Sequence, residues 1–217
     1  MEFSEERRSM VEHQLRTRGI VDERILAVMG DLPRESFVAS GMVSRAYEDG
    51  ALALADGQTI SQPYMVALMT QELRVRADST VLEVGTGSGY QAAVLAELAF
   101  HVYTIERIAS LSERARKILA GLGYDNVSFH IGDGSIGWPE PIDFDRIIVT
   151  AGAPRRPERL LESLRPGGIL VAPVGPARSQ DLMVYRKLPD GCVREKNVCQ
   201  CIFVPLIGRE GWVPGGQ

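Results

Sequence analysis

Residues 80–90 read Thr80-Val81-Leu82-Glu83-Val84-Gly85-Thr86-Gly87-Ser88-Gly89-Tyr90. The first five residues are mostly β-branched or apolar, a composition typical of a buried strand. Three glycines follow within five residues, and glycine lets a backbone turn tightly and approach a ligand because it has no Cβ. The apolar stretch at 91–100 then predicts a helix whose first amide groups can face that ligand. We therefore expect a strand, a glycine-rich turn and a helix in direct succession.

Strands and helices alternate along the chain that follows. Further strands are predicted at 102–105, 127–131, 145–150 and 168–173, with helices at 108–120 and 157–164. This rhythm predicts an α/β fold, a doubly wound and mostly parallel Rossmann-like sheet with helices on both faces. After Gly175 the helical pattern ends, and two antiparallel strands at 181–187 and 198–205 are expected to complete the sheet.

The N-terminal part of the chain is predicted to be helical. Apolar residues recur at helical spacing over 10–15. Two further helices are expected, one between a cap at Asp22 and Pro33 and one over 64–73. Because the sequence shows no linker and no internal repeat, we expect a single domain over 1–217.

The composition of the chain excludes several classes of protein. Hydrophobic residues make up 45% and charged residues 24%, which is ordinary for a globular protein. No apolar run approaches the ~20 residues needed to span a bilayer, so no membrane association is expected. The charged N-terminus lacks the apolar region of a signal peptide, which predicts a cytoplasmic protein. The net charge of −4 argues against nucleic acid as the main partner.

Cysteine and histidine usage gives no indication of a metal site. The three cysteines are odd in number and gather near the C-terminus, and the three histidines are scattered. Neither pattern matches a disulfide framework or a known metal-ligand spacing. We therefore expect no metal.

Acidic residues end two of the strands that follow the glycine-rich turn. Glu106 ends the second strand about 20 residues after the turn begins, where a carboxylate can bind a ribose diol. Asp133 stands between two glycines after the third strand and can accept a hydrogen bond from an adenine amino group. Each residue also has a structural interpretation, an ion pair with Arg107 or Arg114 for Glu106 and a turn for Asp133. Together with the glycine turn, they favour an adenosine-containing cofactor at the edge where these strand ends meet.

The spacing of the glycines favours one such cofactor. A dinucleotide turn reads G-x-G-x-x-G, whereas this turn reads G-x-G-x-G and follows Glu83. A carboxylate at that position repels a pyrophosphate and suits the sulfonium and ammonium groups of S-adenosylmethionine. The expected fold is then of the S-adenosylmethionine methyltransferase type. The residues expected to bind the cofactor are Glu83, Gly85, Thr86, Gly87, Ser88, Gly89, Tyr90, Glu106, Asp133 and Gly134.

The sequence resembles the protein-L-isoaspartate(D-aspartate) O-methyltransferase family almost from end to end. Its most distinctive match is Gly57-Gln58-Thr59-Ile60-Ser61-Gln62-Pro63. Further matches lie at 10–15, 18–20, 33–38, 46–49, 82–90, 132–134, 137–139 and 203–208.

The resemblance implies methyl transfer to the free α-carboxylate of L-isoaspartyl residues in damaged proteins and peptides, leading through a succinimide to normal aspartate. Ser61 holds the position of the family's proposed active-site serine. The residues expected at the substrate are Thr59, Ile60, Ser61, Val204, Pro205 and Leu206. The domain then divides into a helical, substrate-side extension at 1–78, a cofactor-binding core at 79–175, and C-terminal strands with a substrate-framing segment at 176–217. We expect the enzyme to be a monomer.

Elementary chemistry agrees with this implication. A main-chain-type carboxylate has a pKa near ~3.5 and is already an anionic nucleophile at neutral pH. The site needs no general base and must instead orient the carboxylate toward the methyl group. The neutral hydroxyl of Ser61 can do so without blunting the nucleophile, although a serine ahead of Pro63 is also typical of a helix N-cap.

Two positions depart from the family pattern. Ser135 stands where a larger side chain is common, and Gly152 is an extra glycine within 149–154. Both are expected near the cleft, where they can alter the choice of substrate.

Three alternatives remain open from the sequence. A methylase of small molecules or nucleic acid can share the fold, but the Asn/Asp-Pro-Pro-aromatic segment of amine-methylating DNA enzymes is absent after the fourth strand. A binding module that lost catalysis is disfavoured by the intact carboxylates. An NAD-linked dehydrogenase is disfavoured by the glycine spacing.

Overall fold

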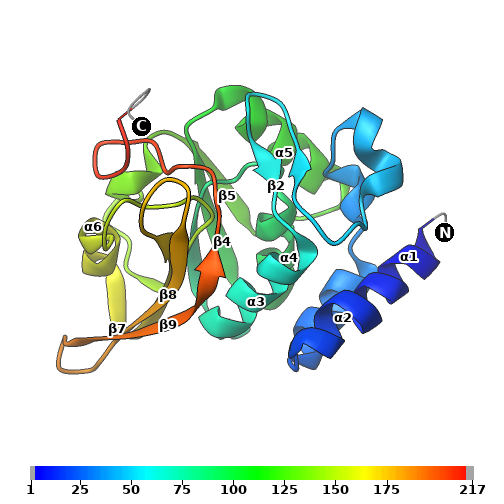
Figure 1. Ribbon diagram of the computed structural model, residues 1–217. Helices are drawn as coiled ribbons and strands as arrows, with labels where there is room; N and C mark the ends of the chain where they lie inside the picture. Colours follow the sequence, from blue (N-terminus) through cyan, green and yellow to red (C-terminus); the bar gives the residue numbers. More distant parts are fainter. Residues whose placement is uncertain (1–2, 214–217) are drawn as a thin grey trace.

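A seven-stranded sheet runs through the centre of the molecule, in the strand order β5-β4-β3-β6-β7-β8-β9 (Figure 1). The strands are β3 (Thr80–Val84), β4 (His101–Glu106), β5 (Val127–Ile131), β6 (Phe144–Val149), β7 (Leu164–Val174), β8 (Gln180–Lys187) and β9 (Val193–Cys201). The first five are parallel, whereas β8 pairs antiparallel with β7 and β9 pairs antiparallel with β8. The predicted doubly wound, mostly parallel sheet is thus confirmed. This computed structural model describes residues 3–213, so the ends of the predicted domain at 1–2 and 214–217 lie outside the described residues.

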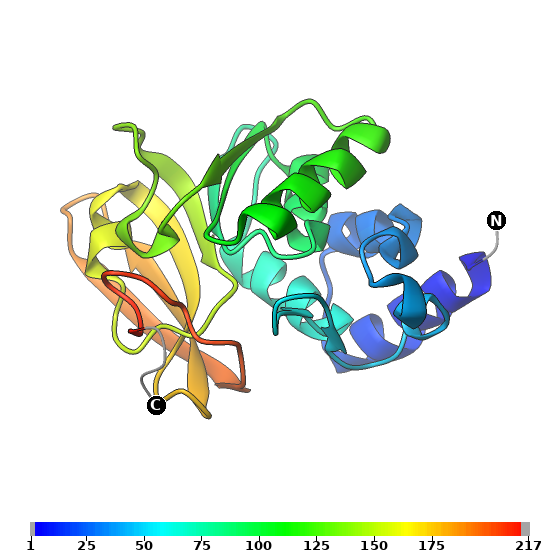
Figure 2. The same cartoon turned by 90° about the horizontal axis from the view of Figure 1, so that it is seen from above.

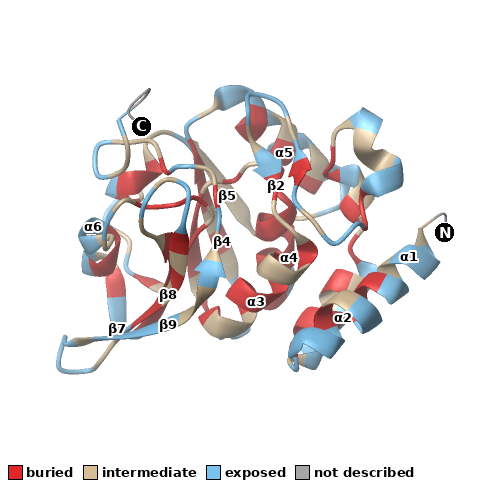
Figure 3. Ribbon diagram, in the orientation of Figure 1, coloured by how far each residue is buried: buried red, intermediate tan, exposed pale blue. Residues whose placement is uncertain are grey.

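Helices cover both faces of the sheet. On one face lie α3 (Pro63–Leu73), α4 (Tyr90–Leu98) and α5 (Ala109–Gly121); on the other lie α6 (Glu158–Glu162) and the 3-10 turn η5 (Gly134–Ile136). The helices change face because the chain reverses its direction of winding after β5, when it returns to pair β6 with β3. The buried strands between the two layers form the red centre of Figure 3.

The N-terminal segments form an outer layer on α3 and α4. They are α1 (Ser4–Ser9), a π-helical stretch η1 (Met10–Leu15), α2 (Glu23–Asp31) and the 3-10 turns η2 (Arg16–Arg18), η3 (Arg34–Ser36) and η4 (Ser40–Arg45). Asp22 caps α2, as predicted, by accepting a 3.0 Å hydrogen bond from the Arg24 amide. Viewed from above, these blue segments lie at the opposite end of the molecule from the orange C-terminal strands (Figure 2). Within residues 3–213, no helix has both the length and the apolar composition that a membrane crossing requires.

A small hairpin, which the sequence pattern does not predict, follows this layer. Strands β1 (Leu52–Ala53) and β2 (Thr59–Ile60) pair antiparallel, and Asp56 and Gly57 at the tip both have positive φ. The Ser110 hydroxyl, at the start of α5, donates a 3.0 Å hydrogen bond to Asp56 Oδ2. The hairpin therefore carries residues 57–61 to the carboxyl edge of the central sheet.

The last strand differs from its predicted range of 198–205. Strand β9 begins at Val193 and ends at Cys201, because the turn after Lys187 closes at once with Lys187 opposite Val193. Residues 194–197 lie exposed on the free edge of the sheet and so lack the apolar signature of a strand. The segment after Cys201 leaves the sheet, and Pro205 makes only an isolated bridge with Gly152.

Candidate active site

A cavity of about 280 Å³ lies at the carboxyl ends of β3, β4 and β6, where the winding of the sheet reverses. This switch point is where ligands bind in open α/β sheets. Its wall is formed by residues that follow four strands and by part of the hairpin. They include Gly85, Thr86, Gly87, Ser88 and Tyr90 after β3, Glu106, Arg107 and Ile108 after β4, Gly134 after β5, and Thr150 and Ala151 after β6.

Glycine is required at different positions of the turn for different structural reasons. Gly85, Gly87 and Gly89 all have positive φ, of 100°, 52° and 88°. A Cβ on Gly89 would lie 2.9 Å from Ala115 Cβ and from Leu119 Cδ1, so this glycine lets α4 pack on α5. A Cβ on Gly87 would meet nothing within 4 Å. Gly87 lines the cavity, and its bare backbone leaves room there for a ligand.

Glu106 ties the turn to the end of β4. Its side chain is 7% exposed and lines the cavity. The Gly87 amide donates to Oε2 at 3.0 Å and the Ile108 amide donates to Oε1 at 2.9 Å. The alternative of an ion pair with Arg107 or Arg114 is wrong, since Glu106 forms no ion pair within residues 3–213 and Arg114 donates to the Val38 carbonyl. The carboxylate is therefore fixed by main-chain donors and keeps acceptor capacity toward the cavity.

Glu83 lies beneath the turn and is completely buried. The Thr104 hydroxyl donates to its Oε2, and Thr104 is in turn hydrogen-bonded to Thr86 at 2.6 Å. The other carboxyl oxygen, Oε1, has no hydrogen-bond partner among residues 3–213. Burial raises the pKa of Glu83 to about 8. Because Glu83 is not among the residues that line the cavity, its direct contact with a cofactor stays a prediction.

Asp133 holds a neighbouring loop. Its Oδ1 accepts hydrogen bonds from the Ser135 amide at 2.9 Å and the Ser135 hydroxyl at 2.6 Å, and its Oδ2 accepts one from the Arg209 amide at 2.7 Å. Burial acts to raise the pKa of Asp133, but the bonds from Arg209 and Ser135 outweigh it and lower the pKa. The Ser135 hydroxyl also accepts from the Glu210 amide. Ser135, which departs from the family pattern, thus helps Asp133 to hold residues 208–210 in place.

Gly134, next to Asp133, lines the cavity directly. A Cβ at this position would lie 2.6 Å from Val84 Cγ1 and 2.9 Å from Ile105 Cγ2. The chain can pass this close to β3 and β4 only as glycine. The predicted adenine contact of Asp133 itself is less direct, because Asp133 is not among the residues of the cavity wall.

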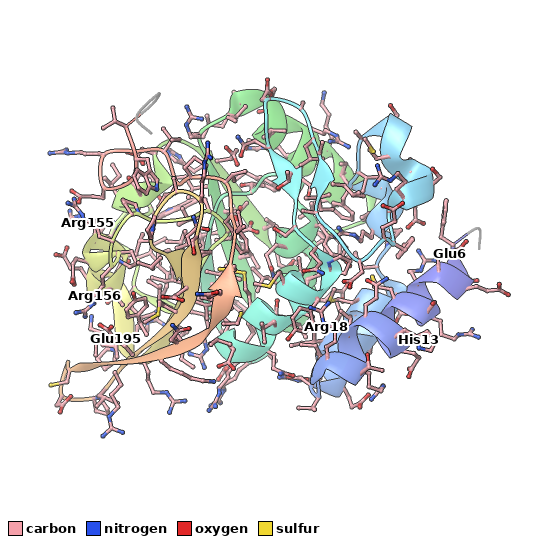
Figure 4. All side chains as sticks on the ribbon, viewed as in Figure 1. Glu6, His13, Arg18, Arg155, Arg156 and Glu195 are labelled. Carbon is pink, nitrogen blue, oxygen red and sulfur yellow. The ribbon has the colours of Figure 1, made fainter. Side chains whose placement is uncertain are left out.

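A second cavity, of about 560 Å³, adjoins the first. Both cavities are lined by Thr59, Ser61, Thr150 and Val204. Arg18 lies on its far side, where the N-terminal layer meets α3 (Figure 4), with its guanidinium 3.7 Å above the centre of the Tyr64 ring. The two cavities thus meet at one shared wall.

Ser61 and Thr150 are two hydroxyl-bearing residues of this shared wall. The helix-cap interpretation of Ser61 is wrong, since the cap residue of α3 is Gln62, which makes no side-chain cap bond. Thr150 is not predicted from the sequence as a site residue, and its only signal was its position after β6. The Thr150 hydroxyl lies 2.6 Å from the Gly85 carbonyl and donates to the glycine turn.

The substrate-side residues predicted from the sequence come together at the first cavity. Its wall includes Thr59, Ile60, Ser61, Val204, Pro205 and Leu206. The segment at 204–206 is held by Gly152, whose amide donates to Val204 and whose carbonyl accepts from Leu206. A Cβ on Gly152 would lie 3.0 Å from the buried Gln180 side chain, so the extra glycine makes room for Gln180.

Comparison with known proteins identifies the family. The family model described as Protein-L-isoaspartate(D-aspartate) O-methyltransferase (PCMT) matches residues 5–211. A "Protein-L-isoaspartate O-methyltransferase" of Syntrophus aciditrophicus (strain SB) is 50% identical over 212 residues, or 97% of each chain. A "Protein-L-isoaspartate O-methyltransferase 2" of Geotalea uraniireducens (strain Rf4) is 52% identical over 206 residues, or 95% of each chain.

Solved structures agree. A protein-L-isoaspartate O-methyltransferase superposes with a TM-score of 0.84 at 30% identity, covering 94% of this chain and 67% of that one. A structure described as a beta-aspartate methyltransferase (PCMT) from Plasmodium falciparum, in complex with S-adenosyl-L-homocysteine, gives a TM-score of 0.81 at 25% identity and covers 93% and 98% of the two chains. With the family model matching nearly the whole length, the chain belongs to the protein-L-isoaspartate(D-aspartate) O-methyltransferase family.

Proposed function

We propose that the chain methylates the free α-carboxylate of L-isoaspartyl residues in damaged proteins and peptides, with S-adenosylmethionine as the methyl donor. The methyl ester then closes to a succinimide, which can hydrolyse to normal aspartate. The observation that carries this proposal is the wall shared by the two cavities. A direct transfer needs a donor site and an acceptor site in contact, and Ser61 and Thr150 lie at that contact.

The residues around the first cavity fit the cofactor. Gly87 leaves open space for a ligand beside the turn, Gly134 brings the chain close to β3 and β4 at the cavity wall, and Glu106 presents a fixed carboxylate for a ribose diol. Oε1 of Glu83 is a buried polar atom beneath the turn that has no partner within residues 3–213. When bound, S-adenosylmethionine supplies an electrophilic methyl group on a sulfonium. We assign its binding to Glu83, Gly85, Thr86, Gly87, Ser88, Gly89, Tyr90, Glu106, Asp133 and Gly134.

On the acceptor side, the chain needs to orient an anion. The substrate carboxylate, with a pKa near ~3.5, is ionised at neutral pH and requires no base. In the described part of the chain the Ser61 hydroxyl has no hydrogen-bond partner, so it is available to donate to that carboxylate. The Thr150 hydroxyl already donates to the Gly85 carbonyl, so Thr150 is assigned only to the cavity wall. Thr59, Ile60, Val204, Pro205 and Leu206 complete the proposed substrate contacts.

The proposal extends to the setting of the enzyme. We assign it to the cytoplasm as a monomer that acts on proteins and peptides and does not act on nucleic acid; the net charge of −4 supports this choice of partner. Residues 1–78 act on the substrate side, 79–175 hold the cofactor and 176–217 frame the substrate. The contributions of Ser61 and Val204 to one wall support this division.

The test is a labelling experiment with purified protein and S-adenosylmethionine labelled in its methyl group. An isoaspartyl peptide and its aspartyl twin are incubated side by side. We expect base-labile label on the isoaspartyl peptide alone. Equal labelling of both peptides, or none of either, would refute the proposal.

A further inference from the structure

Arg34 is the largest fully buried side chain and carries a charge. Its Nε donates to the Ala46 carbonyl and one terminal nitrogen donates to the Ser61 carbonyl, both at 2.8 Å. Within residues 3–213 the other terminal nitrogen has no hydrogen-bond partner, and no carboxylate there forms an ion pair with Arg34. Burial lowers its pKa, although a guanidinium stays protonated at neutral pH. Burying such a group is costly unless it is well compensated, so its place in the interior requires a reason.

The same guanidinium packs on a residue of the first cavity. Its central carbon lies 4.8 Å from the centre of the Tyr90 ring. Phe37 packs edge-on against the same ring at 5.4 Å. Tyr90 begins α4 and lines the cavity beside the glycine turn. The short segment 34–37 therefore contacts the Tyr90 ring through two side chains.

The Ser61 main chain depends on Arg34 for its position. Ser61 lies between β2 and α3, outside both elements. Its carbonyl is bonded to Arg34, and the start of α3 that follows it has no side-chain cap. The main chain of Ser61, a residue of the shared wall, is thus held by a residue that lines neither cavity.

We propose that Arg34 is a positioning residue for methyl transfer: it holds Ser61 and Tyr90 in a fixed relation, so that the acceptor and donor sides of the shared wall stay aligned. This rests on the proposed function. Arginine suits the role because its planar fork serves two carbonyls from different segments while its face packs on a ring. A lysine has one compact donor group but no planar face to stack on the ring. A methionine has neither a donor group nor a planar face.

The experiment compares Arg34→Met and Arg34→Lys with a control, Arg114→Met. Arg114 also donates to a carbonyl of the N-terminal layer, that of Val38, but lines neither cavity. Active sites are counted by calorimetric titration with S-adenosylhomocysteine, and kcat and KM for an isoaspartyl peptide are expressed per titrated site. Thermal unfolding is recorded in parallel. Counting sites separates misaligned molecules from unfolded ones.

We expect Arg34→Met to lower kcat per titrated site by at least about 10-fold, with a smaller change in KM, and to raise the Kd for S-adenosylhomocysteine several-fold through Tyr90. The kcat per site and the Kd of Arg34→Lys should lie between those of wild type and Arg34→Met. This variant still tests the proposal if the methionine variant does not fold. The control should lose stability but keep its kcat per site within about twofold. A lower melting temperature for Arg34→Met or Arg34→Lys with unchanged kcat per site and unchanged Kd would overturn the proposal.

The two proposals fail separately. If the wild type does not label the isoaspartyl peptide, the proposed function is wrong. The effect of Arg34 on Tyr90 is still read from the Kd for S-adenosylhomocysteine, which needs no turnover. An unchanged Kd in both Arg34 variants would then refute the positioning of Tyr90.

Discussion

The main-chain amide of Gly87 donates a 3.0 Å hydrogen bond to Glu106 Oε2, and so joins the glycine turn after β3 to the end of β4. The second oxygen of the same carboxylate accepts from the Ile108 amide. One side chain thereby fixes two segments of the cavity wall. A change at Glu106 should therefore affect the shape of the wall as well as any contact with a ligand.

Glu106→Gln should weaken binding of S-adenosylhomocysteine by at least about 10-fold and lower the free energy of unfolding by about 1–2 kcal/mol. The glutamine amide group would face one of the two main-chain donors and leave it unsatisfied. Calorimetry and urea unfolding measure the two effects. Glu113→Gln, on the exposed side of α5, is the matched control. Unaltered affinity in Glu106→Gln would show that this carboxylate is not a cofactor ligand.

Glu83→Gln should change how stability depends on pH. Burial raises the pKa of Glu83 from 4.5 to about 8 in the folded protein. Between these values the folded state holds a proton that the unfolded chain releases, so the stabilisation from this group is complete below about pH 4.5 and is lost as pH rises toward 8. The free energy of unfolding of the variant, relative to that of the wild type, should therefore rise by roughly 1 kcal/mol per pH unit across this window. Urea unfolding at several pH values tests this, and parallel curves for the two proteins would contradict it.

Ser61→Ala should lower kcat for an isoaspartyl peptide by roughly 10- to 100-fold, which corresponds to the loss of one hydrogen bond to a charged group. Binding of S-adenosylhomocysteine should stay within about twofold, because the hydroxyl is assigned to the acceptor. Steady-state kinetics and calorimetry separate the two. A large loss of cofactor affinity would contradict this division of roles. The bond from Arg34 to the Ser61 carbonyl is kept in this variant, so the main chain should not move.

Asp133→Asn should weaken binding of S-adenosylhomocysteine several-fold and loosen residues 208–210. An asparagine can keep one oxygen acceptor but not both, and Oδ1 and Oδ2 both accept hydrogen bonds here. Calorimetry measures the first effect, and hydrogen exchange at the Arg209 and Glu210 amides measures the second. Faster exchange with unchanged affinity would limit Asp133 to holding the loop and refute its assignment to the cofactor.

Local sequence patterns predict the features that arise within one strand–turn–helix unit. The strand Thr80–Val84, the positive-φ glycines and the acidic strand end at Glu106 all follow from spacing and residue type. The contacts that cross the chain do not. Arg34 reaches Ser61 across 27 positions, and Arg209 reaches Asp133 across 76. No periodicity encodes such pairs.

The displaced bounds of β9 have a related cause. Its residues 194–197 are exposed at the edge of the sheet, so they are polar and show the sequence pattern of a loop. The strand is specified by pairing with β8, from Lys187 opposite Val193 to Gln180 opposite Cys201. The sequence does not identify Thr150 for a similar reason, since the role of Thr150 depends on the Gly85 carbonyl, 65 positions away.

Gly87→Ala and Gly89→Ala should separate the ligand-binding and packing roles of the turn. At Gly87 the added methyl group meets no protein atom within 4 Å, and φ of 52° costs an alanine about 1 kcal/mol. The main effect should be on S-adenosylhomocysteine, with affinity at least about 10-fold weaker. At Gly89 the methyl group would lie 2.9 Å from Ala115 and Leu119, and the free energy of unfolding should fall by about 2–4 kcal/mol.

Gly121→Ala, at the end of α5, is the control for both substitutions. Its added methyl group also meets nothing within 4 Å, and its φ is not positive. It should be neutral or slightly stabilising, because alanine lowers the conformational entropy of the unfolded chain relative to glycine. Calorimetry on the folded fraction and urea unfolding should thus rank Gly87→Ala as the stronger binding defect and Gly89→Ala as the stronger stability defect. The reverse ranking would mean that the cofactor lies against α4 and α5 and does not lie in the open space beside Gly87.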